Sequence, residues 1–467
     1  MIASATANPV WTQNPSSASR LTGAGVAVVS ANEEVLVWDV KTGDLLSRWK
    51  DDTCKAEATV IAQSKLDKDV FAVGYSDGSI RIWDWKTAQT VISFNGHRSA
   101  VSALAFDRSG TRLASGGKDA HIIIWDLIAE VGLYRLKGHK DQITKVEFLR
   151  GSNGASEEED EDLLDAEGGE DGYLISTGKD ALIKLWELST QHCMETHVAH
   201  HGECWGMALS PDQRGCITTG NDGELKVWAI DTQGLNSSVV TKETKCLLDR
   251  GYLYRSSKNR GVTVTFHPTS NYIATHGADK SVEIWRIRTE DEIKKVLKRK
   301  RKRKAEKLKE ASDLEPEGDI SAATVEGIFV SYVVFRTGGK VRGIDWASKP
   351  GKANSIQILV SLTNNSLELY DIPKPPSGRD KKKIPEVPDY KKLYSVEMAG
   401  HRSDVRSLAL SSDDRMLASA SSDSLKIWNV KTSTCIRTFE CGYALCCSFL
   451  PGDKIVSEHN LTIVSCD

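Results

Sequence analysis

The sequence predicts an all-β fold, a β-propeller of seven blades followed by the start of a second propeller. Three observations favour this fold. One strand pattern recurs along the chain, an aromatic residue closes each copy, and three of the seven intervals between these aromatics match one blade, where a blade takes ~40–45 residues. A single eight-bladed ring would use the same copies. The proline-rich, charged stretch at 373–392 favours a boundary, because a strongly typical repeat follows it.

The recurring pattern is an apolar strand, a turn and a second strand that ends in an aromatic residue. The eight copies read SANEEVLVWD, YSDGSIRIWD, GKDAHIIIWD, GKDALIKLWE, GNDGELKVWA, GADKSVEIWR, LTNNSLELYD and SSDSLKIWN. Their closing aromatics are Trp38, Trp83, Trp125, Trp186, Trp228, Trp285, Tyr370 and Trp428. The second strand alternates between polar and apolar residues, which predicts one buried and one exposed face.

Each turn carries Asp or Asn at a fixed offset from the closing aromatic. Six residues before it stand Asn32, Asp77, Asp119, Asp180, Asp222, Asp279 and Asn364, whereas Asp423 stands five before. These side chains hydrogen-bond locally or tolerate positive φ, as a tight hairpin requires. The offset therefore predicts a hairpin in every copy.

These motifs resemble the WD40-repeat family over nearly the whole chain. In that family an opening His, a Ser or Thr, the turn Asp and the strand Trp form a hydrogen-bonded structural network. The matching sets are His97, Ser115, Asp119 and Trp125; His139, Ser176, Asp180 and Trp186; His200, Thr218, Asp222 and Trp228; and His401, Ser419, Asp423 and Trp428. Copies one, two, six and seven lack the opening His, so we expect mainly apolar packing to hold those blades.

The spacing between copies exceeds one blade at four places, which indicates insertions. They fall at the acidic segment 151–171, at 231–260, at the basic segment 289–311 and at 373–392. We expect residues 1–396 to form one propeller that carries these insertions. Residues 397–467 would form the first blade and part of the next blade of a second, truncated propeller, since the last repeat loses its Asp turn and Trp.

The overall composition favours an intracellular protein. The chain has 10 cysteines but no recurring Cys-x-x-Cys pair, which suits reduced thiols. No apolar run reaches the ~18 residues that a membrane helix needs. The N-terminus lacks a basic start followed by an apolar stretch, so neither secretion nor a membrane is expected.

The net charge of −3 conceals two segments of opposite sign. Residues 157–171 are acidic, and we expect a loop that cannot bury enough apolar surface to become ordered. Residues 289–311 are rich in helix formers, with acids first and cations later, which predicts a helix projecting from the sixth blade. We interpret its cations as a nuclear-import or RNA-phosphate contact, against a merely solvated arm: Lys298, Arg299, Lys300, Arg301, Lys302, Arg303 and Lys304.

No catalytic residue, metal site or cofactor is predicted, and no small-molecule substrate. The His, Ser/Thr and Asp sets recur in several blades, as a structural role requires and an active site does not. No phosphate-binding, dinucleotide or HExxH motif is present. A cluster of histidines and cysteines could suggest zinc, but the repeat alignment gives two of its members other roles: His192, Cys193, His197, His200, His201 and Cys204.

Two details resemble one branch of the family, the WD-repeat subunits of the small-subunit processome. They are the run VAHHGECWGMALSPDQRGCITTGNDGELKVW, and the acidic insertion of blade four combined with a Lys/Arg helix after SVEIWR. The resemblance implies a non-catalytic scaffold of the nucleus and nucleolus that supports ribosomal RNA processing. Its partners would be other processome subunits, including WD-repeat proteins, with pre-ribosomal RNA and small nucleolar RNA contacted directly or indirectly.

Two other functions compete with this interpretation. A substrate receptor of a cullin-type ubiquitin ligase would carry Arg two residues after a Trp-Asp pair. Only Trp285-Arg-Ile-Arg places Arg there, and it lacks the Asp. A generic signalling scaffold remains the other alternative, although the Lys/Arg segment argues against it.

Overall fold

The structure is a computed structural model. It describes residues 9–12, 25–150, 171–231, 235, 245–307, 324–346, 355–374, 389–397, 400–401, 403–422, 424–432, 434–440, 446–450, 454–457 and 462–464.

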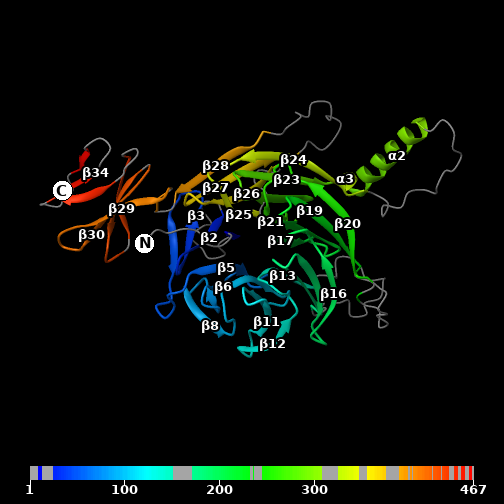
Figure 1. The fold of residues 1–467 in the computed structure, drawn as a ribbon, viewed down its shortest axis with the longest axis horizontal. Coiled ribbons are helices and arrows are strands. Elements are labelled where there is room, and N and C mark those ends of the chain that lie inside the picture. The colour runs from blue at the N-terminus through cyan, green and yellow to red at the C-terminus, as the bar shows by residue number, and fades with distance from the viewer. Residues whose placement is uncertain are drawn as a thin grey trace.

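Seven four-stranded antiparallel sheets, the blades, stand around a central channel (Figure 1). Within each blade the strands follow sequence order from the channel outwards. Blades 1 to 4 comprise β1(Val10–Thr12), β2(Val26–Ala31), β3(Glu34–Asp39), β4(Leu45–Trp49); β5(Ala58–Gln63), β6(Val70–Tyr75), β7(Ser79–Asp84), β8(Gln89–Asn95); β9(Val101–Phe106), β10(Arg112–Gly117), β11(His121–Asp126), β12(Val131–Lys137); and β13(Ile143–Leu149), β14(Tyr173–Gly178), β15(Leu182–Glu187), β16(His192–Val198).

Blades 5 to 7 repeat this arrangement and carry two helices between the last two strands of blade 6. Their strands are β17(Cys204–Leu209), β18(Gly215–Gly220), β19(Glu224–Ile230), β20(Leu247–Tyr254); β21(Gly261–Phe266), β22(Tyr272–Gly277), β23(Ser281–Ile287), β24(Phe329–Arg336); and β25(Val341–Trp346), β26(Ser355–Leu362), β27(Ser366–Pro373), β28(Lys391–Glu397). The helices are α2(Glu290–Lys307) and α3(Val325–Ile328). Because β20 lies within 231–260, the insertion predicted there is shorter than expected.

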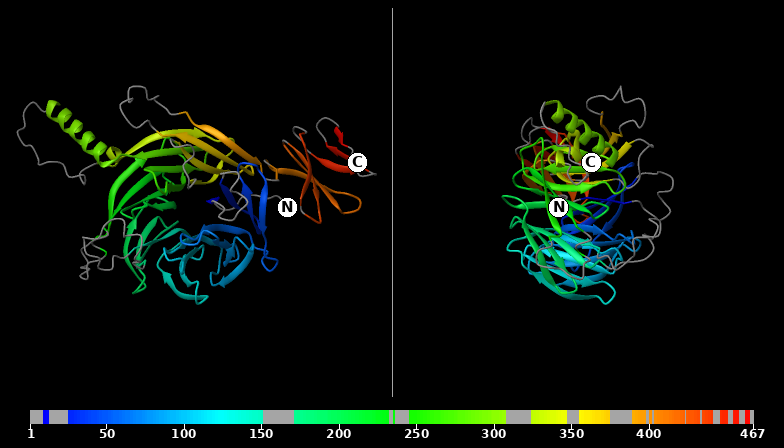
Figure 2. Two further views of the ribbon diagram at one scale, coloured as in Figure 1. Left: turned by 180° about the vertical axis from the view of Figure 1, so that it is seen from behind. Right: turned by 90° about the vertical axis from the view of Figure 1, so that its right-hand side faces the viewer.

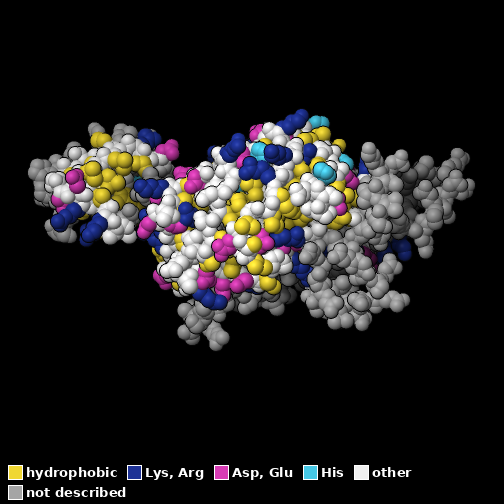
Figure 3. Space-filling view, turned by 90° about the horizontal axis from the view of Figure 1, so that it is seen from below, with side chains coloured by type: hydrophobic (Ala, Val, Ile, Leu, Met, Phe, Trp, Pro, Cys, Tyr) yellow, Lys and Arg dark blue, Asp and Glu magenta, His cyan; other side chains and the backbone are white. Residues whose placement is uncertain are grey.

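The middle strands of a blade are buried on both faces. In blade 3, β10 and β11 are almost wholly buried, whereas the outer strand β12 is largely exposed. Each sheet packs between two neighbouring sheets, so both of its faces bury apolar side chains. The prediction of one exposed face was made for the strand that follows each turn, which is the third strand of the blade, and it was therefore wrong. Figure 3 shows hydrophobic side chains on the outer surface, and the exposed ones include Val91 and Leu133 of the outer strands.

The ring closes between blade 7 and blade 1. Ala27 and Val29 of β2 share one buried apolar cluster with Leu359, Leu367 and Leu369 of blade 7. The innermost strand β1 also lies beside β25. This closure confirms the predicted seven-bladed propeller, and the alternative of one eight-bladed ring is wrong.

Two further sheets follow the ring. They are β29(Val405–Leu410), β30(Met416–Ser421), β31(Leu425–Asn429), β32(Cys435–Phe439), and then β33(Cys447–Leu450), β34(Lys454–Ser457), β35(Thr462–Val464). Figures 1 and 2 place them on the opposite side of the ring from α2. The Asn365 amide of blade 7 donates a hydrogen bond to the His401 carbonyl at 2.6 Å, which ties this eighth sheet to the ring.

Candidate interaction sites

Blade 3 contains a chain of hydrogen bonds that runs from an indole to a carboxylate. The Trp125 indole donates to the Ser115 hydroxyl at 2.8 Å, and that hydroxyl lies 2.7 Å from His97 Nε2. His97 Nδ1 lies 3.1 Å from the Asp119 carboxylate. Asp119 also accepts from the backbone amides of Arg98 and His121. The network therefore fixes the hairpin turn, the loop that enters the blade and the third strand against one another.

Blades 4 and 5 repeat this geometry with their own residues. The His Nδ1 to carboxylate distances are 2.9 Å for His139 and Asp180 and 3.0 Å for His200 and Asp222. The hydroxyl and indole partners are Ser176 and Trp186 in blade 4, and Thr218 and Trp228 in blade 5.

The eighth sheet brings together three members of its predicted set. His401 Nε2 lies 2.5 Å from the Ser419 hydroxyl, which accepts from the Trp428 indole at 2.7 Å. His401 Nδ1 lies 2.8 Å from the Ser421 hydroxyl. The fourth member, Asp423, lies outside the described residues.

Burial sets the protonation state of the network. It lowers the pKa of His97 and of His200, against the opposing attraction of Asp119 and Asp222. Burial alone would raise the pKa of Asp119, but the hydrogen bonds that it accepts from the Arg98 and His121 amides and from His97 outweigh burial, and the pKa falls below its ordinary value. A neutral imidazole can donate through Nδ1 to the carboxylate and accept through Nε2 from the hydroxyl.

A glycine beside the imidazole makes this packing possible. A Cβ at Gly117 would stand 2.6 Å from His97 Nδ1 and 2.5 Å from the Asp119 carboxylate. In blade 6 a Cβ at Gly277 would instead stand 2.7 Å from the Arg255 guanidinium. An arginine therefore occupies in blade 6 the place that a histidine occupies in blade 3.

The blades without an opening His contain ion pairs, and the pair of blade 6 is buried. Arg255 pairs with Glu283 in blade 6 at 3.9 Å, with both side chains at most 1% exposed. Each of the other three blades also pairs an acid with a base, Glu34 with Arg48 in blade 1, Asp51 with Arg81 in blade 2 and Glu368 with Lys392 in blade 7. The expectation that apolar packing holds these blades left out these pairs, which join residues from separate strands and loops.

The basic segment forms helix α2, which projects outward from the ring (Figure 1). Its first turn carries Glu290, Asp291 and Glu292, which suits the positive end of the helix dipole. Ile293 is buried at its base, whereas Lys298 and Arg299 are exposed. The backbone remains helical through Lys300, Arg301, Lys302, Arg303 and Lys304, whose side chains lie outside the described residues, as do residues 308–311.

All four predicted insertions leave the ring at one face. They connect β13 to β14, β19 to β20, β23 to β24 and β27 to β28. In an antiparallel blade these first-to-second and third-to-fourth connections lie at the same end. The hairpins and entry loops that hold the His and Asp networks lie at the other end. Residues 151–170 of the acidic insertion lie outside the described residues.

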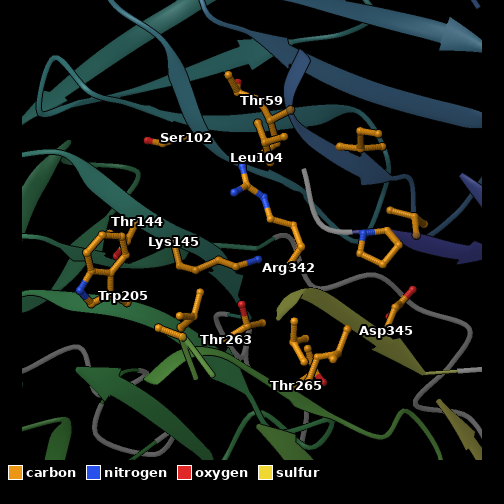
Figure 4. Close-up of a pocket in the computed structure, with 18 of the residues that line it drawn as sticks. Thr59, Ser102, Leu104, Thr144, Lys145, Trp205, Thr263, Thr265, Arg342 and Asp345 are labelled. Carbon is orange, nitrogen blue, oxygen red and sulfur yellow. The ribbon is translucent and has the colours of Figure 1, made fainter. Parts of the chain in front are cut away.

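A basic channel mouth lies at the face without insertions (Figure 4), and the sequence did not lead us to predict it. The cavity has a volume of about 860 Å³, and its lining includes five cations and two acids, namely Lys118, Lys145, Arg260, Lys340, Arg342, Glu57 and Asp345. The repeats contain a position that could have indicated this lining. In blades 2 to 7 the second residue of the inner strand falls at a β-bulge, which turns that side chain towards the channel, as for Ser102, Trp205 and Arg342.

The described residues include no group of three or more side chains suited to hold a metal ion. Of the histidine and cysteine cluster, His192, Cys193 and His197 belong to the outer strand β16. His200 belongs to the blade 5 network, and Cys204 is buried in β17. Among the helices of the described part, none is both long and apolar enough to span a membrane.

Two family models match the chain. The model for the WDR3 first beta-propeller domain matches residues 25–230, and that for the WD domain, G-beta repeat, matches residues 391–429. With the closed ring and its recurring hairpins, these matches make the chain a WD40-repeat β-propeller protein.

The chain is similar to U3 small nucleolar RNA-associated protein 12 of Saccharomyces cerevisiae. The two are 39% identical over 96% of this chain and 45% of the yeast protein. The WD repeat-containing protein 3 of mouse is 34% identical over 44% of this chain and 21% of its own length, and the human protein is 33% identical over the same shares. The chain therefore spans less than half the length of these curated relatives.

Proposed function

We propose that this chain is a non-catalytic scaffold subunit of a nucleolar complex that processes pre-ribosomal RNA for the small ribosomal subunit. The observation that carries the proposal is the 39% identity, over 96% of the chain, to a protein named for its association with U3 small nucleolar RNA. A closed ring with long charged insertions suits a protein that holds other macromolecules in place.

Partner binding would use both the ring and its insertions. Other subunits of the complex, WD-repeat proteins among them, would bind the ring and its C-terminal sheets. Helix α2 would contact RNA phosphates through Lys298, Arg299, Lys300, Arg301, Lys302, Arg303 and Lys304. The exposure of Lys298 and Arg299 and the outward direction of the helix support this role, and the contact would be electrostatic and independent of sequence.

The test is the replacement of all seven cations at 298–304 with Gln. Glutamine has nearly the helix propensity of Lys and Arg, so the helix should persist. We expect RNA binding to weaken, and the slope of log affinity against log salt to fall by ~0.7 for each phosphate that the helix no longer neutralises. Tagged protein purified from its own cells should then recover less pre-ribosomal RNA.

A charge-preserving control exchanges each Lys for Arg and each Arg for Lys at 298–304. It should retain both RNA recovery and the salt slope, because the charge is unchanged. Equal RNA recovery with the glutamine variant would overturn the role of α2. Recovery of cullin adaptors, or of signalling proteins without RNA, by the unmodified chain would overturn the scaffold role itself.

A further inference from the structure

The outer strand of blade 5 carries two exposed tyrosines side by side. Tyr252 and Tyr254 of β20 are 49% and 63% exposed. Because they stand two positions apart on one strand, both side chains leave the same face of the sheet. Their ring centroids lie 5.6 Å apart, with an angle of 79° between the ring planes. This tyrosine pair therefore presents two aromatic rings to solvent on the outer wall of the ring of blades, where Figure 1 shows β20.

Two carboxylates stand beside the tyrosine pair. Glu224 of β19 is the direct cross-strand partner of Tyr254, which brings their side chains to one place on the sheet. Glu326 belongs to α3, which lies against β20. Partial desolvation, the other tyrosine and the charges of both glutamates raise the pKa of Tyr254. Within the described part of the chain, neither carboxylate has a Lys, Arg or His nitrogen within 4.0 Å.

A glycine in β20 holds α3 close to the tyrosine pair. Gly251 adopts a φ of +112°, a conformation that suits a residue without a side chain. A Cβ at this position would stand 3.4 Å from Cγ2 of Val325 in α3. Val325 is buried in one apolar cluster with Leu253 of β20. Packing therefore fixes α3 against the strand, and with it the place of Glu326.

The same two strands already show how an aromatic ring and a carboxylate hold a cation. Lys226 Nζ lies 4.6 Å from the centroid of the Trp228 ring and 3.1 Å from the Asp249 carboxylate. The tyrosine pair and Glu224 repeat this combination further along the sheet. Among the described residues, however, no Lys or Arg is stacked on either tyrosine ring. Aromatic faces and acids are therefore available there to a cation from another molecule.

The chemistry of this site favours an arginine over other ligands. A guanidinium is planar, stacks on aromatic rings and donates paired hydrogen bonds to a carboxylate. A trimethylated lysine would contact the rings but has no proton to donate to Glu224 or Glu326. RNA bases would stack on the tyrosines, but the two carboxylates would repel the phosphates beside them. Only arginine uses both the rings and the acids.

We propose that the tyrosine pair, together with Glu224 and Glu326, binds an arginine side chain of a partner protein on the outer wall of blade 5. The guanidinium would stack on a tyrosine ring and donate hydrogen bonds to the carboxylates. None of the four residues belongs to the lining of the channel, and none is among the cations that we assign to RNA. The site therefore adds a protein contact that does not depend on the RNA contact of α2.

The test measures fluorescence anisotropy of a fluorescein-labelled decapeptide of alternating Arg and Gly, titrated with the full chain. The acids between 157 and 170 are replaced with Gln and Asn, so that the acidic insertion cannot bind the peptide. In this background we expect Tyr252→Leu combined with Tyr254→Leu to raise Kd about tenfold, because cation–π contact is lost. Tyr252→Phe combined with Tyr254→Phe keeps both rings and should still bind.

The role of the carboxylates is tested by Glu224→Gln combined with Glu326→Gln. We expect Kd to rise at least about tenfold, because charge-assisted hydrogen bonds are removed, and the remaining binding to depend less on salt. The matched control is Glu130→Gln combined with Asp414→Asn, which removes the same charge from two exposed turns of other sheets. It should leave Kd unchanged.

Four outcomes would overturn the proposal. The first is no binding of the Arg peptide, or an equal weakening in the control. The second is equally tight binding of a Lys-Gly peptide, which would indicate attraction by charge alone. The third and fourth are tighter binding of a trimethyl-lysine peptide or of a labelled oligouridine, lost in the leucine variant, which would assign the tyrosines to those ligands. RNA binding by α2 is measured separately with the substitutions at 298–304, so each proposal can fail without the other.

Discussion

Blades 3 and 6 join the same elements by different chemistry. In blade 3 neutral and charged groups form an unbroken hydrogen-bonded chain through His97 and Asp119. In blade 6 Arg255 and Glu283 are buried together at 3.9 Å, and two guanidinium nitrogens of Arg255 have no hydrogen-bond partner among the described residues. The first arrangement satisfies its polar groups, whereas the second relies on two opposite charges that water cannot reach.

The largest effect is expected from breaking the blade 6 pair. Glu283→Ala would leave Arg255 buried without its counter-charge, which costs about 3–5 kcal/mol. The midpoint of urea unfolding would measure this loss. Replacing both partners, as Arg255→Met with Glu283→Leu, should recover most of the stability because no unpaired charge remains. A double variant as unstable as Glu283→Ala would show that the pair is not the cause.

The next largest effect is a dependence of stability on pH, which comes from His276 in blade 6. Burial lowers the pKa of His276 to about 4, whereas the unfolded value is about 6.5. As pH falls, the unfolded state therefore binds a proton at His276 before the folded state does. The contribution of this residue to stability is complete above about pH 6.5 and declines towards pH 4. The decline from this residue is on the order of 3 kcal/mol, at about 1.4 kcal/mol for each pKa unit.

Unfolding midpoints measured between pH 7 and pH 4 would test the role of His276. His276→Gln should flatten the dependence of stability on pH, even if it lowers stability overall. The exposed His201 provides the control, since His201→Gln should leave the slope unchanged. An unaltered slope in His276→Gln would assign the acid sensitivity to other groups.

The smallest expected loss of stability distinguishes two kinds of hairpin turn, one whose Asp bonds a histidine and one whose Asp bonds a serine of the same turn. Asp119→Ala should cost about 1–3 kcal/mol, because it removes bonds to His97 and to two amides. Among the described residues, Asp77 of blade 2 accepts hydrogen bonds within its own turn, from the amide and hydroxyl of Ser79. Asp77→Ala should therefore cost about 1 kcal/mol or less. Equal shifts in the unfolding midpoint would mean that the histidine adds nothing to the turn.

The sequence led to the correct ring because the features that define a blade are local. A turn Asp and a Trp six residues later lie in one hairpin, so each copy can be recognised alone. The Arg255–Glu283 pair could not be predicted in this way, since its members lie 28 positions apart without a shared motif. The channel mouth was missed for a related reason. All seven blades contribute residues to its lining, and the common location of these residues emerges only when the ring is closed.

The placement of the insertions has a consequence for how such a chain can vary. At one face, the hairpins are locked to neighbouring loops through residues such as His97 and Asp119, so a change of loop length there would dismantle a network. At the other face, none of the described connections between strands contains a His and Asp network. Segments can be lengthened, exchanged or fused there while the His and Asp networks of the ring stay intact. The part of the molecule that must stay fixed is thus separate from the part that can acquire new partners.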